Sequence, residues 1–277
     1  MGRKVGHAGE PFQSIHRALM GKELQRVPWE ALARHGLDKD RLNAVADAWS
    51  VRVQTEFRSI QVMTRFMTEV VAAGDPIEVY AGAAEALVDE IKHTALCVGV
   101  VESLGFTPFL PEPLVEKEAP GFLSLPMAQR ALGTAVSMLA VSETLSVALI
   151  EDLRLRCRHP ALSMVLALTL ADEDTHRDFG WAYIEASLRR FESDEAIGFA
   201  RTVAEATLEP HVRGAMAVVA AMKPEDRNLD RSDRWGEPDL VEWGLLSRER
   251  EALIQLATIE RVIMPRLTAL GIAPSLS

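Results

Sequence analysis

Long stretches of helical periodicity, each with clear start and stop signals, are the feature that most constrains this chain. After Leu37-Asp38, apolar residues recur every three or four positions as far as Ala73, and Gly74 then supplies a typical helix-ending glycine. The inner face predicted for this helix consists of Trp49, Val53, Glu56, Ile60, Met63, Phe66 and Val70. A helix of this length needs other helices to cover its apolar face.

Comparable signals divide the rest of the chain. The sequence Asp75-Pro76-Ile77-Glu78 predicts an N-cap, an N1 proline and a capping-box glutamate, and the helix that follows should end at Leu104. The other expected helices cover about 126–157, about 160–191, a segment starting at Ser193-Asp194 with a kink or break near Pro210, and about 247–270 with a bend at Pro265. Residues 105–125 are predicted to be a connector and Lys223 to Asp239 an exposed charged loop.

The connector lengths predict how the helices are arranged. The first two helices are joined tightly at Gly74-Asp75, and the third and fourth at His159-Pro160, so each pair should form an antiparallel hairpin. The connector between the hairpins, roughly 20 residues, can span about 66 Å, more than the roughly 42 Å of a helix of about 28 residues. We therefore expect one all-α domain over 1–277. Its parts are a four-helix bundle over about 38–191 with a long crossover between the second and third helices, and additional helices over about 193–270.

The composition agrees with packed helices in a soluble protein. Hydrophobic residues make up 48% of the chain but aromatic residues only 6%, which suits helices better than sheets. The net charge of -10 is spread without a basic stripe, so nucleic acid is not an expected partner. Cys97 and Cys157 form no paired framework and the N-terminus lacks a signal-peptide pattern, so a cytoplasmic location is expected. The apolar stretch Ala131 to Ile150 contains Glu143, which argues against a membrane span.

Each predicted hairpin carries the same acidic and imidazole groups in the same order. The first has Glu56 and then Asp89-Glu90-Ile91-Lys92-His93; the second has Glu143 and then Asp172-Glu173-Asp174-Thr175-His176. Residues three apart on a helix share a face, so each Glu-x-x-His presents an oxygen and a nitrogen ligand together. Buried carboxylates without cations would repel one another and take up protons. Two divalent metal ions between them would remove that cost.

The competing interpretation is a solvated acidic face. One Glu-x-x-His match is expected by chance in a chain so rich in glutamate and means little by itself. Two matches, each preceded by Asp and each paired with an upstream helical Glu, are much rarer. Glu143 and Glu173 also follow runs of Leu, Ala and Val, where a solvated face would not lie. These points favour a metal site.

The order Glu, Glu-x-x-His, Glu, Glu-x-x-His on four helices resembles the ferritin-like di-iron carboxylate superfamily. The resemblance covers about residues 38–191 and is specific for the metal site and the fold, but not for the substrate. The ligands it implies are Glu56 and His93 for one iron, Glu143 and His176 for the other, and Glu90 and Glu173 as bridges. Manganese is possible at one of the two sites.

The aspartate before each Glu-x-x-His resembles the oxygen-activating branch of that superfamily. There, each such Asp hydrogen-bonds the histidine of the other pair, which implies that Asp89 orients His176 and that Asp172 orients His93. Cys97 stands where ribonucleotide reductase subunits carry a radical tyrosine, which argues against ribonucleotide reduction. Thr169 stands where arylamine N-oxygenases have an additional histidine, so six protein ligands are expected.

The function implied is a di-iron oxygenase or oxidase that uses O₂ to hydroxylate, N-oxygenate or desaturate a small organic substrate. No flavin or nicotinamide motif is visible, so an external reductase or ferredoxin is expected to supply electrons. A homodimer is possible, and no membrane partner is expected. The alternative is an iron-handling ferroxidase or storage subunit, although the helices after Phe191 favour an enzyme because they could cap a substrate cavity. The remaining histidines are expected at the surface: His7, His16, His35, His159 and His211.

Overall fold

The computed structural model describes residues 2–34, 36–115, 117–118, 120–191, 194–229 and 238–276. The regular elements of the described residues are helices, and the bridge between Lys4 and Phe109 is isolated and belongs to no strand. The prediction of an all-α protein is therefore confirmed. The main helices are α1 (Phe12–Leu24), α2 (Trp29–Ala33), α3 (Lys39–Ala73), α4 (Ile77–Ser103), α6 (Met127–Thr134), α7 (Glu143–Arg156), α8 (Pro160–Phe191), α9 (Asp194–Ala221), α11 (Arg248–Thr258) and α12 (Met264–Ala269). The shorter elements are α5 (Pro120–Leu123), α10 (Pro238–Val241), the 3₁₀ turn η2 (Pro224–Asp226) and the π-helical segments η1 (Ala135–Ser142) and η4 (Ile259–Ile263).

Helix α3 begins and ends where its local signals predict. The side chain of Asp38 accepts hydrogen bonds from the backbone N–H groups of Asp40 and Arg41, which would otherwise lack partners at the helix start. Gly74 follows the last turn with φ 70°, a left-handed conformation that glycine adopts without a steric cost.

Helix α4 begins differently from the prediction. The cap position is Pro76, and no side chain caps the first turn. The carboxylate of Asp75 instead accepts a hydrogen bond of 2.9 Å from the hydroxyl of Tyr183 and pairs with Arg190, both on α8. The prediction of Asp75 as the N-cap is therefore wrong, because a tertiary contact uses the same oxygens.

The third long helical stretch covers the predicted residues but is not a regular α-helix. Its middle, η1, is π-helical, and Ser142 donates a hydrogen bond of 2.8 Å to the carbonyl of Ser137, five residues earlier. Gly180 of α8 packs directly on this segment, since a Cβ atom there would lie 2.5 Å from the backbone of Leu139. The π-helical segment ends at Ser142, directly before Glu143.

The C-terminal third differs from the prediction in two places. Helix α9 runs unbroken through Pro210, so the predicted break is absent. The last helix has three parts, because η4 precedes α12 and Pro265 lies in the first turn of α12, which tolerates a missing N–H group. Of the predicted charged loop, residues 223–229 include the turn η2, whereas residues 230–237, like Ser193 at the expected start of α9, lie outside the described residues.

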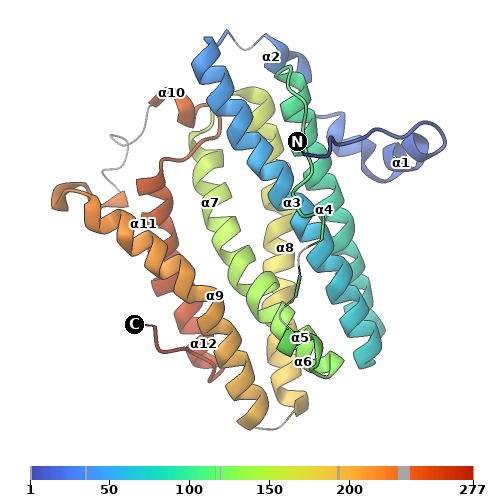
Figure 1. Ribbon diagram of the computed structural model, residues 1–277, viewed down its shortest axis with the longest axis vertical. Helices are drawn as coiled ribbons and strands as arrows, with labels where there is room; N and C mark the ends of the chain where they lie inside the picture. The colour runs from blue at the N-terminus through green and yellow to red at the C-terminus, as the bar shows by residue number, and fades with distance from the viewer. Residues whose placement is uncertain are drawn as a thin grey trace.

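The long helices lie side by side along the longest axis of the molecule (Figure 1). Helix α3 packs against α4 and α6, and α8 packs against α4, η1 and α7. The connector after α4 runs beside the bundle to α5 and α6 at its opposite end (Figure 1). The N-terminal arm holds this connector, since the N–H of Val5 donates to the carbonyl of Pro108 and the N–H of Leu110 donates to that of Arg3.

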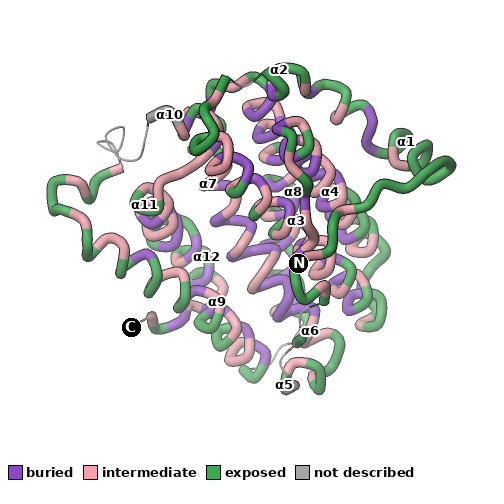
Figure 2. The backbone as a smooth tube through the Cα atoms, turned by 45° about the horizontal axis from the view of Figure 1, so that its top comes forward, coloured by how far each residue is buried: buried purple, intermediate pink, exposed green. Residues whose placement is uncertain are grey.

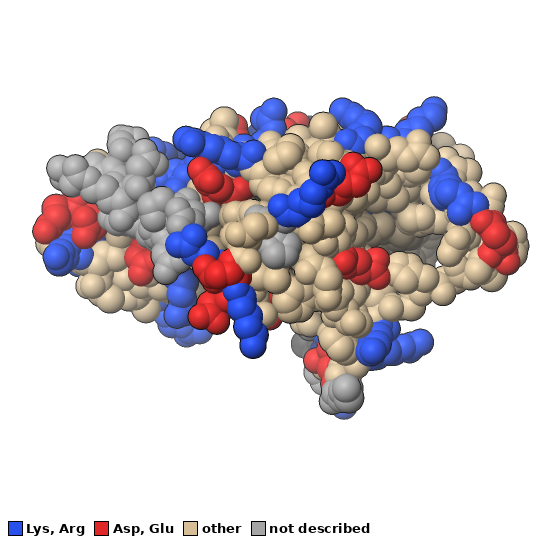
Figure 3. Space-filling view, turned by 90° about the horizontal axis from the view of Figure 1, so that it is seen from above, with Lys and Arg blue, Asp and Glu red and all other residues tan. Residues whose placement is uncertain are grey.

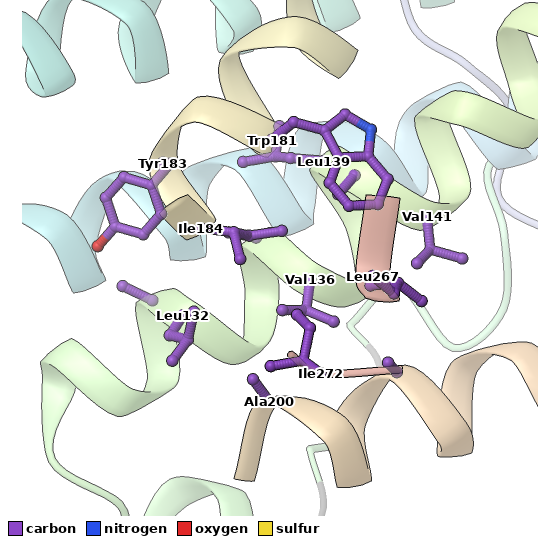
Figure 4. Close-up of a cluster of buried hydrophobic side chains, with 14 of the residues drawn as sticks. Leu132, Val136, Leu139, Val141, Trp181, Tyr183, Ile184, Ala200, Leu267 and Ile272 are labelled. Carbon is purple, nitrogen blue, oxygen red and sulfur yellow. The ribbon is translucent and has the colours of Figure 1, made fainter. Parts of the chain in front are cut away.

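Helices α9, α11 and α12 cover the side of the bundle formed by η1 and α7 (Figure 1). Figure 4 shows Leu267, Ile272 and Ala200 from this layer around Val136 of η1, all within one buried apolar cluster. Buried positions concentrate where the long helices meet, whereas most of α1 is exposed (Figure 2). The added helices therefore bury the outer face of the third helical stretch.

That third stretch, Met127–Arg156, is long and apolar enough to cross a membrane, with a mean hydropathy of 1.6 over its most apolar window. Inside the fold, 61% of that window is buried, as in the core helix of a soluble protein. On the face drawn in Figure 3, acidic and basic side chains are interspersed.

Candidate metal centre

The structure brings the six predicted ligands together in the middle of the helical bundle. Helix α3 contributes Glu56, α7 contributes Glu143 at its first residue, and α4 and α8 each contribute one Glu-x-x-His pair. Glu90, His93, Glu143, Glu173 and His176 are all at most 3% exposed. Burial of so many ionisable groups at one point is costly unless cations or hydrogen bonds compensate them.

The donor atoms fall into two groups of four that share two glutamates. One group is Glu56, Glu90, His93 and Glu173, and the other is Glu90, Glu143, Glu173 and His176. Within each group the donor atoms lie within 4.8 Å of one another, so either group could hold a metal ion. The shared members, Glu90 and Glu173, are the two that the sequence analysis expects to bridge.

The spacing inside the cluster is that of donors arranged around cations. Nδ1 of His93 lies 3.6 Å from Glu90 and 3.5 Å from Glu173, and Nδ1 of His176 lies 3.5 and 3.3 Å from the same two carboxylates. Most of these separations are too long for hydrogen bonds. Two donors bound about 2.1 Å from one ion lie roughly 3–4 Å apart, which matches.

Several donor atoms in the cluster are buried and have no hydrogen-bond partner in the described structure. They are both carboxylate oxygens of Glu90, one oxygen each of Glu143 and Glu173, and Nδ1 of His93 and of His176. Native proteins leave few such atoms unpaired, and each costs about 1–3 kcal/mol. Bound cations would satisfy all of them at once, so the residues present fit a metal pair.

The far nitrogen of each imidazole contacts an aspartate from the other hairpin. Nε2 of His93 lies 3.0 Å from Asp172, and Nε2 of His176 lies 3.3 Å from Asp89. An imidazole that donates its Nε2–H to a carboxylate keeps the lone pair on Nδ1, which here faces the cluster. These are the crossed contacts that the sequence analysis expects of the two aspartates.

Lys92 is a member of this constellation that the sequence analysis missed. Its ammonium is buried and lies 2.9 Å from Asp89 and 2.7 Å from Asp172. Burial by itself lowers the pKa of Lys92, but the two aspartates outweigh it and raise the pKa, so the ammonium stays charged. The spacing Asp89 to Lys92 is a local signal for the first contact. Only the packing of α4 on α8 brings in Asp172.

Without metal, burial favours the protonated forms of Glu56 and Glu143, one from each donor group. Burial raises the pKa of Glu56 to about 8, and it raises that of Glu143 well above its ordinary value. Burial acts to lower the pKa of His176, but the hydrogen bond it donates to Asp89 and the nearby carboxylates of Glu173 and Glu90 outweigh burial and raise the pKa to about 12. Protons thus take the place of cations when the cluster holds no metal.

A cavity of about 490 Å³ opens beside Glu56. All four long helical stretches contribute to its wall, together with the segment around Gly244 and the start of α11. Most of the wall is apolar; the side chains from α7 and α8 that line it include Leu149, Ile150, Leu153, Val165 and Leu166. Its volume lies in the range typical of small-molecule sites.

Arg52 contributes a cationic group to the wall of this cavity. Its guanidinium lies 4.4 Å from the ring centre of Trp49, and Nη2 donates a hydrogen bond of 2.8 Å to the carbonyl of Gly244. Gly244 has φ 76°, and a Cβ atom there would lie 3.2 Å from Trp49, so glycine lets this segment close over α3. Nη1 of Arg52 is buried without a partner in the described structure.

Other residues singled out in the sequence lie near the cavity or away from it. Cys97 is buried in the cavity wall, and burial raises the pKa of its thiol well above the ordinary value, so it is not a thiolate. Thr169 lines the same cavity. His159 was expected at the surface but is half-buried, with its ring 4.5 Å from that of Trp243. His35 lies outside the described residues.

A second cavity, of about 540 Å³, lies between the N-terminal arm and helices α3 and α4. None of the metal-ligand candidates lines it. The cavity beside Glu56 is lined by one of the metal-ligand candidates, so it offers a small molecule a way to the cluster.

Comparison of the chain with protein-family models, with curated proteins and with solved structures found no match. The functional assignment accordingly depends on the geometry of the cluster and of the cavity beside it.

Proposed function

We propose that this protein is a di-iron oxygenase or oxidase that uses O₂ to oxidise a small organic molecule. The observation that carries the proposal is the joining of two features: a buried cluster of Glu and His donors, and an apolar cavity of about 490 Å³ that reaches one of its members, Glu56. A site that only stored iron would need a route for hydrated ions. An apolar cavity favours an organic substrate instead.

In this proposal the role of each residue follows from whether it belongs to one donor group or to both. Glu90 and Glu173 belong to both groups and would be shared by the two metals, whereas Glu56 with His93 would hold one metal and Glu143 with His176 the other. Carboxylate and imidazole donors suit iron, and manganese at one site is compatible with the same donors. An iron pair held there would supply the electrons with which O₂ is activated.

The protein's own contribution is to orient the ligands and to exclude water. Asp172 and Asp89 hold the imidazoles with Nδ1 toward the cluster, and Lys92 joins the two aspartates. The apolar walls of the cavity keep bulk water from the reacting atoms. Electrons would come from an external reductase or ferredoxin.

The fold supports the same proposal. Two helical hairpins each carry Glu and then Glu-x-x-His, and a long connector runs beside the bundle between them (Figure 1). We propose that this is a ferritin-like bundle with a crossover between its second and third helices. After α8, the segment 244–246 and Glu251 of α11 complete the cavity wall.

Anaerobic loading with ferrous iron, followed by addition of O₂, tests the proposal. We expect about two irons per chain and O₂ consumption limited by the electron donor. The matched control is the exposed Glu151 of α7, whose replacement by Ala should leave the iron content unchanged. Iron contents near zero in the unaltered protein would refute the metal site. Hundreds of irons retained in a large hollow particle would replace the oxygenase with a storage protein.

A further inference from the structure

Arg52 is a cationic group in the wall of the cavity beside Glu56, and part of its hydrogen-bonding capacity is unused. Arg52 is held in place by Trp49 and by the carbonyl of Gly244, which together fix the plane of its guanidinium. The Nη1 atom is buried and has no hydrogen-bond acceptor within the described chain. A guanidinium fixed in this way has donors left for a ligand that brings its own acceptors.

The acidic groups around Arg52 do not take this role. Glu56 and Glu251 both line the cavity, and both lie close enough to act on the charge of Arg52. Neither forms an ion pair with it in the described structure, and Glu251 accepts a hydrogen bond of 3.1 Å from Gln255. The remaining donor of Arg52 is thus available.

We propose that the cavity binds a small carboxylic acid with an apolar body, and that the guanidinium of Arg52 binds its carboxylate. A carboxylate matches the planar donors of a guanidinium. The aliphatic side chains of α7 and α8 suit an apolar body. The inference names the substrate class of the proposed oxygenase and in that sense depends on the proposed function.

The position of Arg52 also relates the bound acid to the metal centre. Arg52 and Glu56 are one helical turn apart on α3, about 6 Å along the helix axis. An acid whose carboxylate is bound at Arg52 therefore lies beside the metal ligand Glu56. Arg52 is a substrate-binding residue in this arrangement, and it fixes which end of the molecule approaches the cluster.

The test compares each acid with the alcohol of equal chain length. The metal-free full-length protein, kept free of metal by a chelator, is titrated calorimetrically with n-alkanoates of six to ten carbons and with the corresponding alcohols. We expect at least one acid to bind roughly 10–100-fold more tightly than its alcohol, the effect of one charge-assisted hydrogen bond. In Arg52→Gln this ratio should fall to near one, while Arg154→Gln, an exposed arginine on α7, should keep it.

Equal affinities of acid and alcohol in the unaltered protein would overturn the inference, and so would an unchanged ratio in Arg52→Gln. If Arg52→Gln does not fold, Arg52→Lys replaces it: the ratio should fall several-fold, because lysine keeps the charge but loses the planar donors. An unchanged ratio in Arg52→Lys would count against the inference. Binding without metal also separates the two proposals, because a protein that binds the acid through Arg52 but never consumes O₂ would refute the oxygenase alone.

Discussion

Lys92 on α4 lies 2.7 Å from Asp172 on α8, and this ion pair joins the two helical hairpins just outside the cluster of Glu and His donors. The same ammonium lies 2.9 Å from Asp89. Each of these aspartates contacts the imidazole of the opposite hairpin. One buried cation therefore helps to hold both histidines in the orientation that a metal pair requires.

Lys92→Met should weaken metal binding while leaving the helical fold in place. Methionine keeps most of the volume but cannot hold the two aspartates, so we expect roughly 10–100-fold lower affinity, the usual effect of losing a group that orients metal ligands. Competition for zinc against a chromophoric chelator measures this. Lys39→Met, at the exposed start of α3, is the matched control. Equal affinities in the two variants would show that Lys92 has no positioning role.

The two shared glutamates should matter more than the terminal ones. Glu90→Ala or Glu173→Ala removes a donor from both groups and should leave well under one iron per chain. Glu56→Ala removes a donor from one group only and should leave about one. Elemental analysis after anaerobic loading and desalting distinguishes these outcomes. Full occupancy in either shared-glutamate variant, together with complete loss in Glu56→Ala, would reverse the assignment of bridging and terminal ligands.

The metal-free protein should become less stable as the pH rises from about 5 to 8. Over this range Glu56, with its pKa raised to about 8, keeps its proton when folded but loses it when unfolded. The folded state then binds more protons, so the free energy of unfolding falls, by at most about 1.4 kcal/mol per pH unit for one group. The raised pKa of His176, about 12, acts in the same direction above its ordinary value of 6.5.

Urea unfolding at several pH values, with a chelator and then with zinc, tests this dependence. Glu56→Gln should reduce the slope of the chelated protein. Zinc should reverse it, since metal binding displaces protons and strengthens as the pH rises. A chelated protein whose stability rises steadily from pH 5 to 8 would contradict the prediction.

Gly180→Ala should destabilise the contact that positions Glu143. The added methyl group would lie 2.5 Å from the backbone of Leu139, so α8 and η1 must separate, at a cost of about 1–3 kcal/mol. Gly198→Ala on α9 is the matched control, because a Cβ atom there meets nothing within 4 Å and alanine favours helix by up to about 1 kcal/mol. Urea unfolding compares the two. Similar stabilities would mean that the helices are not in tight contact at Gly180.

Features that depend on neighbours along the chain could be predicted from the sequence. Helix α3 begins after Asp38 and ends before Gly74, as predicted, because an N-cap and a left-handed glycine act within one turn of the helix. The two Asp-Glu-x-x-His segments could be predicted to present their Glu and His side chains together for the same reason, since residues three apart on a helix share a face. The helical class and the six clustered Glu and His residues follow from such local rules.

Features that depend on contacts between distant segments could be seen only in the folded protein. The carboxylate of Asp75 could have capped α4, but Tyr183 and Arg190 of α8 occupy it instead. The π-helical η1 and the close approach of Gly180 arise where two helices pack, and no local pattern specifies them. In the sequence Arg52 is one more charged residue of α3. In the folded protein it donates a hydrogen bond to the carbonyl of Gly244, far along the chain, and one buried donor is left without a partner in the described structure. The physical reason is that helix signals act over a few residues, whereas burial and pairing are set by whichever segment packs opposite.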